Sequence, residues 1–448
     1  MTRPFRHDGA GTTALEWVRR PEWAEVPLWN PLGADRPERV VVVAAHPDDE
    51  SLGAGGVIAM IRAAGIPVTL VVATAGERSH PRSPTITATA LAGQRRSEAE
   101  QAWAALGGDA GELTIWDLPD GSLAAQENEA TSRLVEVLGD GRATLLLAPY
   151  LEDGHSDHDA LGRAAQRAAY RTGAILLHYP VWLWHHADPG EVPWGRLRRV
   201  ALAAFDRNAK ARAVACHRSQ IAPLSDRPRD ETLLSPSLIE HFTGPHETFI
   251  LGQARDDALD DLHSEHVDPW GTTTRWYEAR KRRLLLAMLP RPRFAQALDL
   301  GCSTGTLTVD LAERCDKLVA VDSSPRALEA AASRTRGLPN VELRLGDLSA
   351  ELPEGNFDLV VLSEAGYFLS PVALDQLIAG ITHVLTADGC LVLAHWRHPI
   401  SGWPLSGPDV HTRFAQARGL PPVAERYLEG NVEIVVHAHE TTLPDPHI

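Results

Sequence analysis

RVVVVAAHPDDES, residues 39 to 51, joins an apolar run to a histidine, a proline and three acidic residues. The continuous β-branched run from Arg39 to Ala45 is typical of a strand in a parallel sheet that is covered on both faces. His46, Asp48 and Asp49 follow at the carboxyl end of this strand, where open α/β sheets bind their ligands. The stretch therefore predicts an α/β fold with a functional site at this edge of the sheet.

The charged residues of this stretch allow two interpretations. His46 and Asp49 offer one nitrogen and one oxygen three residues apart, which suits two corners of a tetrahedral zinc site. Asp48 would then remain as a carboxylate that can act as a general base. The alternative is structural, because Asp48 and Asp49 could simply cap the helix expected over Leu52 to Ala64.

A second strand end favours the metal site. Leu145 to Ala148 is another short apolar run, and the loop after it, PYLEDGHSDH at residues 149 to 158, contains His155 and His158. The carboxyl ends of parallel strands lie on one edge of a sheet, so this loop can complete a site that begins at His46. The loop therefore supplies the missing third ligand.

The two motifs together are similar to those of a known enzyme family. A-H-P-D-D-E at Ala45 to Glu50, followed by H-x-D-H at His155 to His158, resembles the paired signatures of the PIG-L/LmbE-like zinc-dependent N-deacetylases. The resemblance covers roughly residues 38 to 252. It implies that this part of the chain removes an acyl group from an amine with the help of zinc.

The resemblance also implies a role for each residue of the two motifs. The implied zinc ligands are His46, Asp49 and His158. Asp48 would be the general base. His155 would be the acid or the oxyanion partner, and Asp157 would orient it.

The helix expected over Leu91 to Leu106 carries a further candidate. Arg95 and Glu98 match an R-x-x-E element of the same family, which implies that Arg95 binds substrate hydroxyls. An arginine and a glutamate at this spacing more often form a solvated pair, and this alternative stays open. The polar loop from Gly76 to Ala90 lies beyond the end of a strand and is a candidate substrate lid.

Length, charge and cysteine content limit the classes of protein. At 448 residues, the chain suits two domains of about 200 residues each. A formal net charge of −16 argues against a nucleic-acid partner, and a small-molecule substrate is expected instead. We find no signal-peptide core and no apolar run that could span a membrane. The four scattered cysteines indicate reduced thiols and a cytoplasmic location.

The domain boundary is expected in an acidic segment that is poor in large apolar residues. The expected arrangement is a first domain at 1–252, with an N-terminal extension at 1–37, a linker at 253–268 and a second domain at 269–448. Both halves alternate strands with helices, although no internal repeat relates their sequences. The expected fold class is therefore α/β, with two doubly wound Rossmann-like domains.

A small-residue loop marks a candidate cofactor site in the second domain. ALDLGCSTG, residues 297 to 305, is a strand that runs into a loop whose backbone can approach a nucleoside closely. Asp322 ends the next strand, where it can accept hydrogen bonds from ribose hydroxyls. A tight turn without a ligand would also explain the loop alone. A nicotinamide dehydrogenase would carry G-x-G-x-x-G, whereas the spacing here is G-x-x-x-G.

The motifs of this half resemble a second enzyme class. DLGCSTG, VDSS, GDL and FDLVVLSEAGYF together resemble class I S-adenosylmethionine-dependent methyltransferases. DPWGTTTRWYEARK at residues 268 to 281 and AHWRHPISGW at residues 394 to 403 are similar, more narrowly, to nodulation-type (NodS-like) amino-sugar N-methyltransferases. Ser303 stands where many methyltransferases have a further glycine. The residues implied to contact S-adenosylmethionine are Asp299, Gly301, Cys302, Gly305, Asp322, Ser323, Asp347, Leu348 and Ser363.

Three polar residues at or after strand ends lie near the expected position of the methyl group. Glu364, Tyr367 and His395 are candidates to accept the proton of an amine or to hold it. For Tyr367 and His395, a structural role is an equal alternative.

Together the resemblances predict a bifunctional enzyme. It would hydrolyse the N-acetyl or another N-acyl group of an amino sugar, glycoside or related small molecule, and then N-methylate the amine with S-adenosylmethionine, in natural-product or antibiotic biosynthesis. One alternative is that only one domain is catalytic and the other is a degenerate binding module. Another is that the domains act on unrelated substrates, including O-methylation. Self-association into a homo-oligomer is compatible with the sequence.

Overall fold

The computed structural model describes residues 11–253, 256–350 and 352–439. These residues form two compact units, one of residues 11–170 with 174–253 and the other of residues 171–173, 256–350 and 352–439. Parts of the expected N-terminal extension, linker and second domain lie outside the described residues, at 1–10, 254–255, 351 and 440–448. None of the helices in the described ranges is long and apolar enough to cross a membrane.

The first unit is a seven-stranded sheet covered by helices on both faces. Its strands, in the order β3-β2-β1-β4-β5-β7-β6, are parallel except that β7 runs antiparallel to β5 and to β6. The strands are β1 (Arg39–Ala44), β2 (Val68–Val72), β3 (Leu113–Ile115), β4 (Thr144–Pro149), β5 (Ile175–Tyr179), β6 (Leu197–Ala201) and β7 (His246–Leu251). The larger helices are α4 (Gly55–Ala63), α5 (Ala88–Ala105), α6 (Glu127–Leu138), α7 (Ser156–Thr172) and α9 (Ala204–Cys216).

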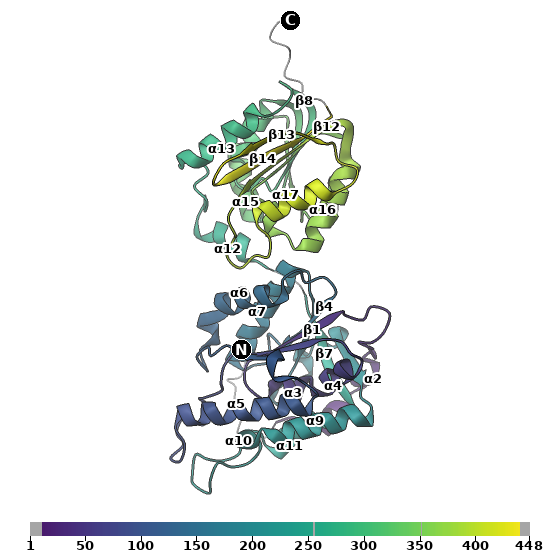
Figure 1. The fold of residues 1–448 in the computed structure, drawn as a ribbon, viewed down its shortest axis with the longest axis vertical. Helices are drawn as coiled ribbons and strands as arrows, with labels where there is room; N and C mark the ends of the chain where they lie inside the picture. Colours follow the sequence, from purple (N-terminus) through teal and green to yellow (C-terminus); the bar gives the residue numbers. More distant parts are fainter. Residues whose placement is uncertain (1–10, 254–255, 351, 440–448) are drawn as a thin grey trace, which may run out of the picture. The chain divides into compact units, whose positions relative to one another are not determined.

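The apolar run of β1 explains why both faces are covered. Val40, Val42 and Ala44 belong to one buried cluster, whereas Val41 and Val43 belong to the cluster on the other face. Helices α6 and α7 lie over one face, and α4, α5 and α9 lie over the other (Figure 1). Alternation along a strand thus distributes a continuous apolar stretch over two cores.

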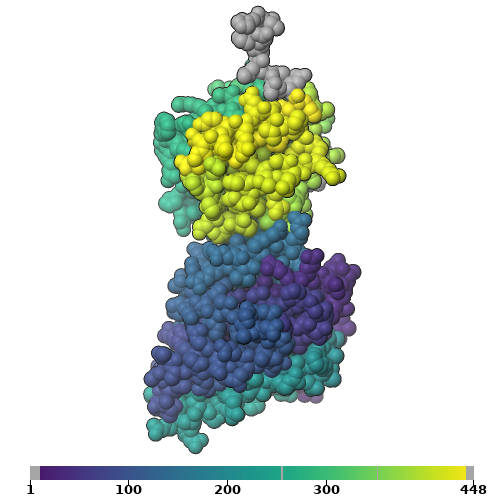
Figure 2. Space-filling model, viewed as in Figure 1, coloured from purple at the N-terminus to yellow at the C-terminus, as the bar shows by residue number. Residues whose placement is uncertain are grey.

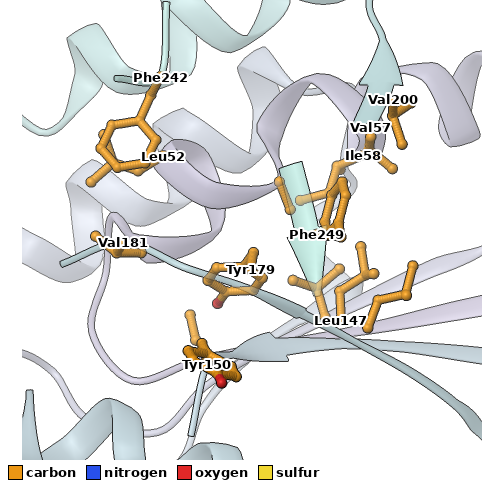
Figure 3. Close-up of a cluster of buried hydrophobic side chains, with 14 of the residues drawn as sticks. Leu52, Val57, Ile58, Leu147, Tyr150, Tyr179, Val181, Val200, Phe242 and Phe249 are labelled. Carbon is orange, nitrogen blue, oxygen red and sulfur yellow. The ribbon is translucent and has the colours of Figure 1, made fainter. Parts of the chain in front are cut away.

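Figure 3 shows part of the larger cluster of the first unit. Phe249 of β7 lies close to Val57 and Ile58 of α4, and all three side chains are fully buried. The carboxylate of Glu247, also on β7, accepts hydrogen bonds of 2.7 Å from the backbone nitrogens of Gly56 and Val57. These bonds satisfy the donors at the start of α4 and fix this helix against the sheet edge.

Two helices near the site begin where the sequence did not place them. The helix expected over Leu52 to Ala64 is divided into α3 (Asp49–Gly53) and α4, because Ala54 leaves the helical conformation within the glycine-rich stretch 53–56. Helix α7 begins at Ser156, within the stretch 149–158 that was expected to be a loop. Acidic residues favour a helix amino terminus, and His158 therefore lies in the first turn of α7 and not in a loop.

The N-terminal extension packs onto the first unit. Helices α1 (Ala14–Val18) and α2 (Pro21–Glu25) precede the segment at residue 28, which forms a parallel bridge with Arg199 of β6. Trp17 is buried and donates from Nε1 to the carbonyl oxygen of Trp184 at 2.7 Å. In Figure 2, the purple N-terminal surface of this unit adjoins the teal surface contributed by residues near 200 to 250.

The second unit repeats the strand order of the first. Its sheet has the order β10-β9-β8-β11-β12-β14-β13, with β14 antiparallel to both of its neighbours. The strands are β8 (Phe294–Leu300), β9 (Cys315–Asp322), β10 (Val341–Leu345), β11 (Phe357–Ser363), β12 (Leu385–Trp396), β13 (Val423–Leu428) and β14 (Val432–His437). Both expected α/β sheets are therefore confirmed, with antiparallel strands at one edge that the sequence did not predict.

The helices of the second unit also divide between two cores. One core contains residues of α16 (Pro371–Val384) and α17 (Gly407–Gln416), and the other contains residues of α13 (Trp276–Ala287) and α14 (Thr306–Ala312). Helix α12 (Ala258–Glu265) lies within the segment expected to be a linker. Ser324, before α15 (Pro325–Arg334), donates to the carboxylate of Asp260 on α12 at 2.5 Å. This helix is therefore packed on the second unit.

Candidate functional sites

The three residues expected to bind zinc converge at the carboxyl ends of β1 and β4. The Nδ1 atom of His46 lies 3.6 Å from Oδ2 of Asp49, and Nε2 of His158 lies 3.2 Å from Oδ1 of the same carboxylate. Asp49 also accepts a hydrogen bond of 2.8 Å from the backbone nitrogen of His46. All three side chains are buried. The structure thus brings together a nitrogen, an oxygen and a second nitrogen from two distant segments.

Each of these histidines has a carboxylate behind it. Nδ1 of His158 lies 2.7 Å from Asp153, while Nε2 of His46 lies 3.2 Å from Asp120 and 3.3 Å from Asp157. A carboxylate on the far nitrogen is the usual way to orient a metal-binding histidine. Nε2 of His158 is buried and faces Oδ1 of Asp49, the other expected ligand. The donor set and its burial both fit a divalent metal such as zinc.

A second combination of ligands involves three histidines. Suitable atoms of His46, His155 and His158 lie within 4.8 Å of one another. The ring centroid of His155 is 5.0 Å from that of His46 and 4.8 Å from that of His158. His155 therefore stands beside both histidines, either as a third nitrogen or as a group that faces the substrate.

The charges of this cluster favour a cation at the ligands. Burial alone would lower the pKa of His46, but hydrogen bonds with Asp120, Asp157 and Asp49 hold it well above its ordinary value. Burial likewise opposes protonation of His158, yet Asp49 and Asp153 raise its pKa to about 10. Surrounding carboxylates thus stabilise positive charge here, which a bound divalent metal would supply.

Asp48 is held apart from the histidines. Its backbone has φ 145° and ψ −28°, a conformation that is strained for a residue with a side chain, and its carboxylate makes no helix-capping hydrogen bond. Oδ2 accepts instead from Nη2 of Arg95 at 3.1 Å. Burial raises the pKa of Asp48 to about 6, against the opposing charge of Arg95. The capping alternative therefore does not describe Asp48.

Arg95 is a buried part of this site. Besides Asp48, its guanidinium donates to the carbonyl oxygens of Pro47, at 2.8 Å, and Gly76, at 3.0 Å. A solvated pair with Glu98 is wrong, because Arg95 and Glu98 are only 2% and 6% exposed and Glu98 binds Ser219. Helix α5 turns the R-x-x-E face towards the sheet, so both side chains are buried. Binding of substrate hydroxyls by Arg95 stays a prediction.

His155 and Asp157 lie together at the start of α7. The backbone nitrogen of Asp157 donates to Nδ1 of His155 at 3.3 Å, while its carboxylate accepts from the backbone nitrogens of Gly121, at 2.7 Å, and Leu123, at 3.1 Å. Burial, followed by the charges of His158 and His46, lowers the pKa of His155 to about 3. Asp157 thus fixes the loop after β3 as well as facing His46.

Two carboxylates of this site were not identified from the sequence. Asp120 follows β3, and Asp153 lies in the histidine-containing loop after β4. Asp153 is fully buried and accepts hydrogen bonds of 2.9 Å from three consecutive backbone nitrogens, those of Val181, Trp182 and Leu183. The available signal was position, since each acid follows a strand at the same sheet edge.

The expected lid is tied down at several points. Ser83 and Thr85 each donate a hydrogen bond of 2.5 Å to the carboxylate of Asp230, in the segment before α11 (Pro236–Glu240). His80 lies with Nε2 at 3.0 Å from the carbonyl oxygen of Glu231. The loop therefore has defined partners in a second loop, and its role as a substrate lid stays a prediction.

The expected cofactor loop of the second unit adopts backbone conformations suited to close approach. Gly301 and Gly305 both have φ 76°, and Ser303 has φ 48° although it is not glycine. Ser303 thus keeps the path that a glycine would give, and its backbone nitrogen donates to Asp322 at 2.7 Å. Its Oγ is buried and has no hydrogen-bond partner among the residues described. An unsatisfied hydroxyl beside an acidic strand end fits a polar, ribose-containing cofactor.

The other residues expected around the cofactor follow the ends of neighbouring strands. Ser323 follows β9, Asp347 and Leu348 follow β10, and Ser363 ends β11. Cys302 is buried in the loop itself. These strands, with β8, are adjacent in the sheet, so the residues share one edge.

Asp299 is placed differently from the rest. It is 1% exposed and accepts a hydrogen bond of 2.7 Å from Thr308 of α14. Burial raises the pKa of Asp299 to about 6. Its carboxylate therefore holds the helix that follows the loop, and its direct contact with the cofactor stays a prediction.

Of the three residues expected near the methyl group, Glu364 and Tyr367 are paired with each other. The hydroxyl of Tyr367 donates to Oε2 of Glu364, and Nζ of Lys281 lies 2.7 Å from Oε1 of Glu364. His395 is fully buried, with Nε2 at 3.3 Å from the backbone nitrogen of Gly366 and Nδ1 at 3.3 Å from His411. Partners inside the fold favour the structural alternative for His395.

The chain is similar to two groups of known proteins. Residues 41–169 match the family described as GlcNAc-PI de-N-acetylase, and residues 297–389 match a methyltransferase domain. A probable N-acetyl-α-D-glucosaminyl L-malate deacetylase of Bacillus subtilis is 36% identical to this chain where the two align. The aligned part covers 30% of this chain and 62% of that protein. A 1D-myo-inositol 2-acetamido-2-deoxy-α-D-glucopyranoside deacetylase of Thermobispora bispora is 33% identical over 43% of this chain and 67% of its own length. Nodulation protein S of Bradyrhizobium diazoefficiens is 30% identical over 37% of this chain and 76% of its own length.

Proposed function

Because the chain belongs to the GlcNAc-PI de-N-acetylase family through its first unit and carries a methyltransferase domain related to nodulation protein S in its second, we propose that it is a bifunctional enzyme. It hydrolyses the N-acetyl, or another N-acyl, group of an amino sugar and N-methylates the released amine with S-adenosylmethionine. The observation that carries the proposal is the convergence of His46, Asp49 and His158 beside Asp48, a carboxylate bound to arginine and not to histidine.

We infer the substrate class from the relatives of the first unit. Two of them are deacetylases of N-acetylglucosamine derivatives, one joined to malate and one to inositol. An N-acetylated glucosamine unit is therefore the part of the substrate that we assign to this chain. Deacylation followed by amine methylation suits the modification of an amino sugar within a larger natural product.

Hydrolysis uses residues of the first unit. His46, Asp49 and His158 would hold zinc, which when bound would polarise the amide carbonyl and lower the pKa of water. Arg95 occupies Oδ2 of Asp48, which leaves Oδ1 to take the proton of the attacking water. Asp48 then delivers this proton to the nitrogen that leaves. His155, beside the ligands, donates an N–H to the oxyanion as it forms.

The order of the two reactions follows from the electron pair on nitrogen. An amide nitrogen shares this pair with its carbonyl, which makes it a poor nucleophile towards a sulfonium methyl group. A free amine keeps the pair available after it loses a proton. Deacylation therefore comes first, and the amine that it releases is the methyl acceptor.

An Asp48→Asn variant tests both the base and the order. With N-acetylated glucosamine compounds and S-adenosylmethionine, we expect hydrolysis to fall by about 10²- to 10⁴-fold and methylated product to disappear. The same variant should methylate the corresponding free amine at the wild-type rate. Mass spectrometry separates the products. A methyl group gained while the acetyl group is retained would overturn the order, and hydrolysis at the wild-type rate would move the base elsewhere.

A further inference from the structure

Helix α13 places the side chains of Tyr277, Glu278 and Lys281 near the ends of β11 and β12. These three side chains lie outside the cofactor loop. Lys281 is 5% exposed, and its Nζ lies 2.7 Å from Glu364 at the end of β11 and 2.8 Å from Glu278 one turn earlier on α13. A buried lysine between two carboxylates is a short, charge-assisted link. Lys281 thus fixes α13 to the strand end that carries Glu364.

Both carboxylate oxygens of Glu364 have partners within the fold. Oε1 binds Lys281, and Oε2 accepts hydrogen bonds from the backbone nitrogen of Trp396, at 3.0 Å, and from the hydroxyl of Tyr367. Its backbone has φ 56°, which is strained for a glutamate. Glu364 and Tyr367 are therefore bound to each other and to the surrounding fold.

The hydroxyl of Tyr277 differs from these carboxylate oxygens. It is buried, and the described residues offer it no hydrogen-bond partner. The Tyr277 ring lies edge-on to Trp396, with centroids 5.7 Å apart, and Nζ of Lys281 is 5.4 Å from its centroid. Burial and the charges of Glu364 and Glu278 raise the pKa of Tyr277, so it remains a neutral phenol. A buried hydroxyl without a partner is a position where a polar ligand atom gains a hydrogen bond.

This group adjoins the cofactor loop. Strands β8 and β11 are paired, with Leu300 opposite Leu362, so the chain leaves both strands side by side at Gly301 and Glu364. A Cβ placed on Gly301 would lie 2.4 Å from the Cβ of Ala365, the residue after Glu364. Glu364, and with it Lys281, Glu278 and Tyr277, therefore lies next to the loop expected to hold S-adenosylmethionine.

We propose that Tyr277 and Glu278 form the amine end of the methyl-acceptor site and that Lys281 is a positioning residue for Glu278 and Glu364. The ligand is a primary amine on a sugar, and this assignment rests on the proposed function. The phenol oxygen of Tyr277 accepts one N–H and aims the nitrogen lone pair. As the N–C bond forms, the S–C bond breaks and its electrons stay on sulfur. The methylammonium then passes one proton to Glu278, leaving a secondary amine and S-adenosylhomocysteine.

The test compares Tyr277→Phe and Glu278→Gln with Tyr427→Phe, whose hydroxyl already binds Arg280 and Glu429. D-glucosamine is the probe, and its methylation and its binding to protein saturated with S-adenosylhomocysteine are both measured. We expect KM and Kd for glucosamine to rise about tenfold in Tyr277→Phe, the loss of one hydrogen bond. Glu278→Gln should lower kcat, and affinity for S-adenosylhomocysteine should stay at the wild-type value in all three variants.

Lysine variants test the positioning role separately. Lys281→Met should lower kcat without changing cofactor affinity, and Lys281→Arg should restore most of it, because arginine can bridge the same carboxylates. Wild-type kinetics in Tyr277→Phe and Glu278→Gln, with methylation of glucosamine by the native protein intact, would overturn the acceptor site alone. Failure of the native protein to methylate glucosamine and every other amino sugar would instead overturn the proposed function, on which the site rests.

Discussion

The first and second units arrange seven strands in the same order, yet they equip the same sheet edge with different chemistry. In the first unit, the chain that leaves β1 and β4 carries histidine and aspartate side chains that point at one another. In the second, the chain that leaves β8 turns through Gly301 and Gly305 and offers mainly backbone. A side-chain site and a backbone site thus occupy equivalent positions.

This difference shows how little the sheet itself decides about function. The parallel strands guarantee that several loops meet at one edge, but the residues of those loops determine what is bound there. Side chains can be exchanged without moving the backbone, whereas a backbone site depends on the absence of a side chain. The two sites should therefore fail in different ways, and the predictions below are arranged from the largest expected effect to the smallest.

The largest effect is expected from the side-chain site. His158→Ala removes a nitrogen ligand and should abolish both metal binding and amide hydrolysis. Methyl transfer to a free amine should remain at the wild-type rate, because the second unit has its own sheet and core. Metal analysis and assays of both activities on the same preparation provide the measurement. Hydrolysis by metal-free protein would contradict the assignment.

The backbone site should fail when one carbon atom is added. Gly301→Ala places a Cβ 2.4 Å from that of Ala365 at φ 76°, so we expect affinity for S-adenosylmethionine to fall more than about tenfold, with hydrolysis unchanged. Calorimetry measures the affinity. Gly337→Ala is the matched control, since Gly337 has φ 90° but nothing within 4 Å of an added Cβ. Equal losses in both variants would mean that backbone strain, and not the contact at Ala365, causes the effect.

A smaller effect on metal affinity is expected from Asp153, which contacts the far nitrogen of the ligand His158. Asp153→Asn weakens the carboxylate that orients His158, which should lower metal affinity by about 10- to 100-fold without abolishing binding. Competition with a chelator of known affinity measures the change. Glu152→Gln changes the adjacent acid, whose hydrogen bond is to Tyr150, and should leave metal affinity unchanged. An unchanged affinity in Asp153→Asn would show that Asp153 serves only the backbone of residues 181 to 183.

The smallest effect concerns stability and pH in the second unit. The pKa of Asp299 is raised from 3.8 to about 6 in the folded state, so the folded state binds more protons between these values and loses stability as the pH rises through them. Asp299→Asn removes this penalty and should stabilise the unit by about 2 to 3 kcal/mol above pH 6, with little change near pH 4. Hydrogen exchange of β8 amides reports it. Destabilisation at both pH values would mean that the ionised bond to Thr308 outweighs burial.

The parts of the fold that were predictable from sequence follow from local patterns. The apolar run of β1 and the glycine loop after β8 each identify a strand end, and both lie where expected. The separate start of α4 was missed, because Glu247, from a distant segment, accepts the hydrogen bonds of its first backbone nitrogens. Helix termini are satisfied by whichever partners the fold provides, and sequence patterns near the terminus do not reveal them.

By itself, the sequence determined which chemical groups this protein can use. The motifs at His46 and His155, and the loop at Gly301, specify metal-binding and cofactor-binding residue types at strand ends. Only the tertiary structure decided how these groups are paired: Asp153 with His158, Arg95 with Asp48, and Glu364 with Tyr367. It also buries the hydroxyl of Tyr277 without a hydrogen-bond partner among the described residues. The physical reason is that a hydrogen bond or ion pair depends on distance, direction and burial. Those quantities are set by contacts between segments that are far apart in the chain.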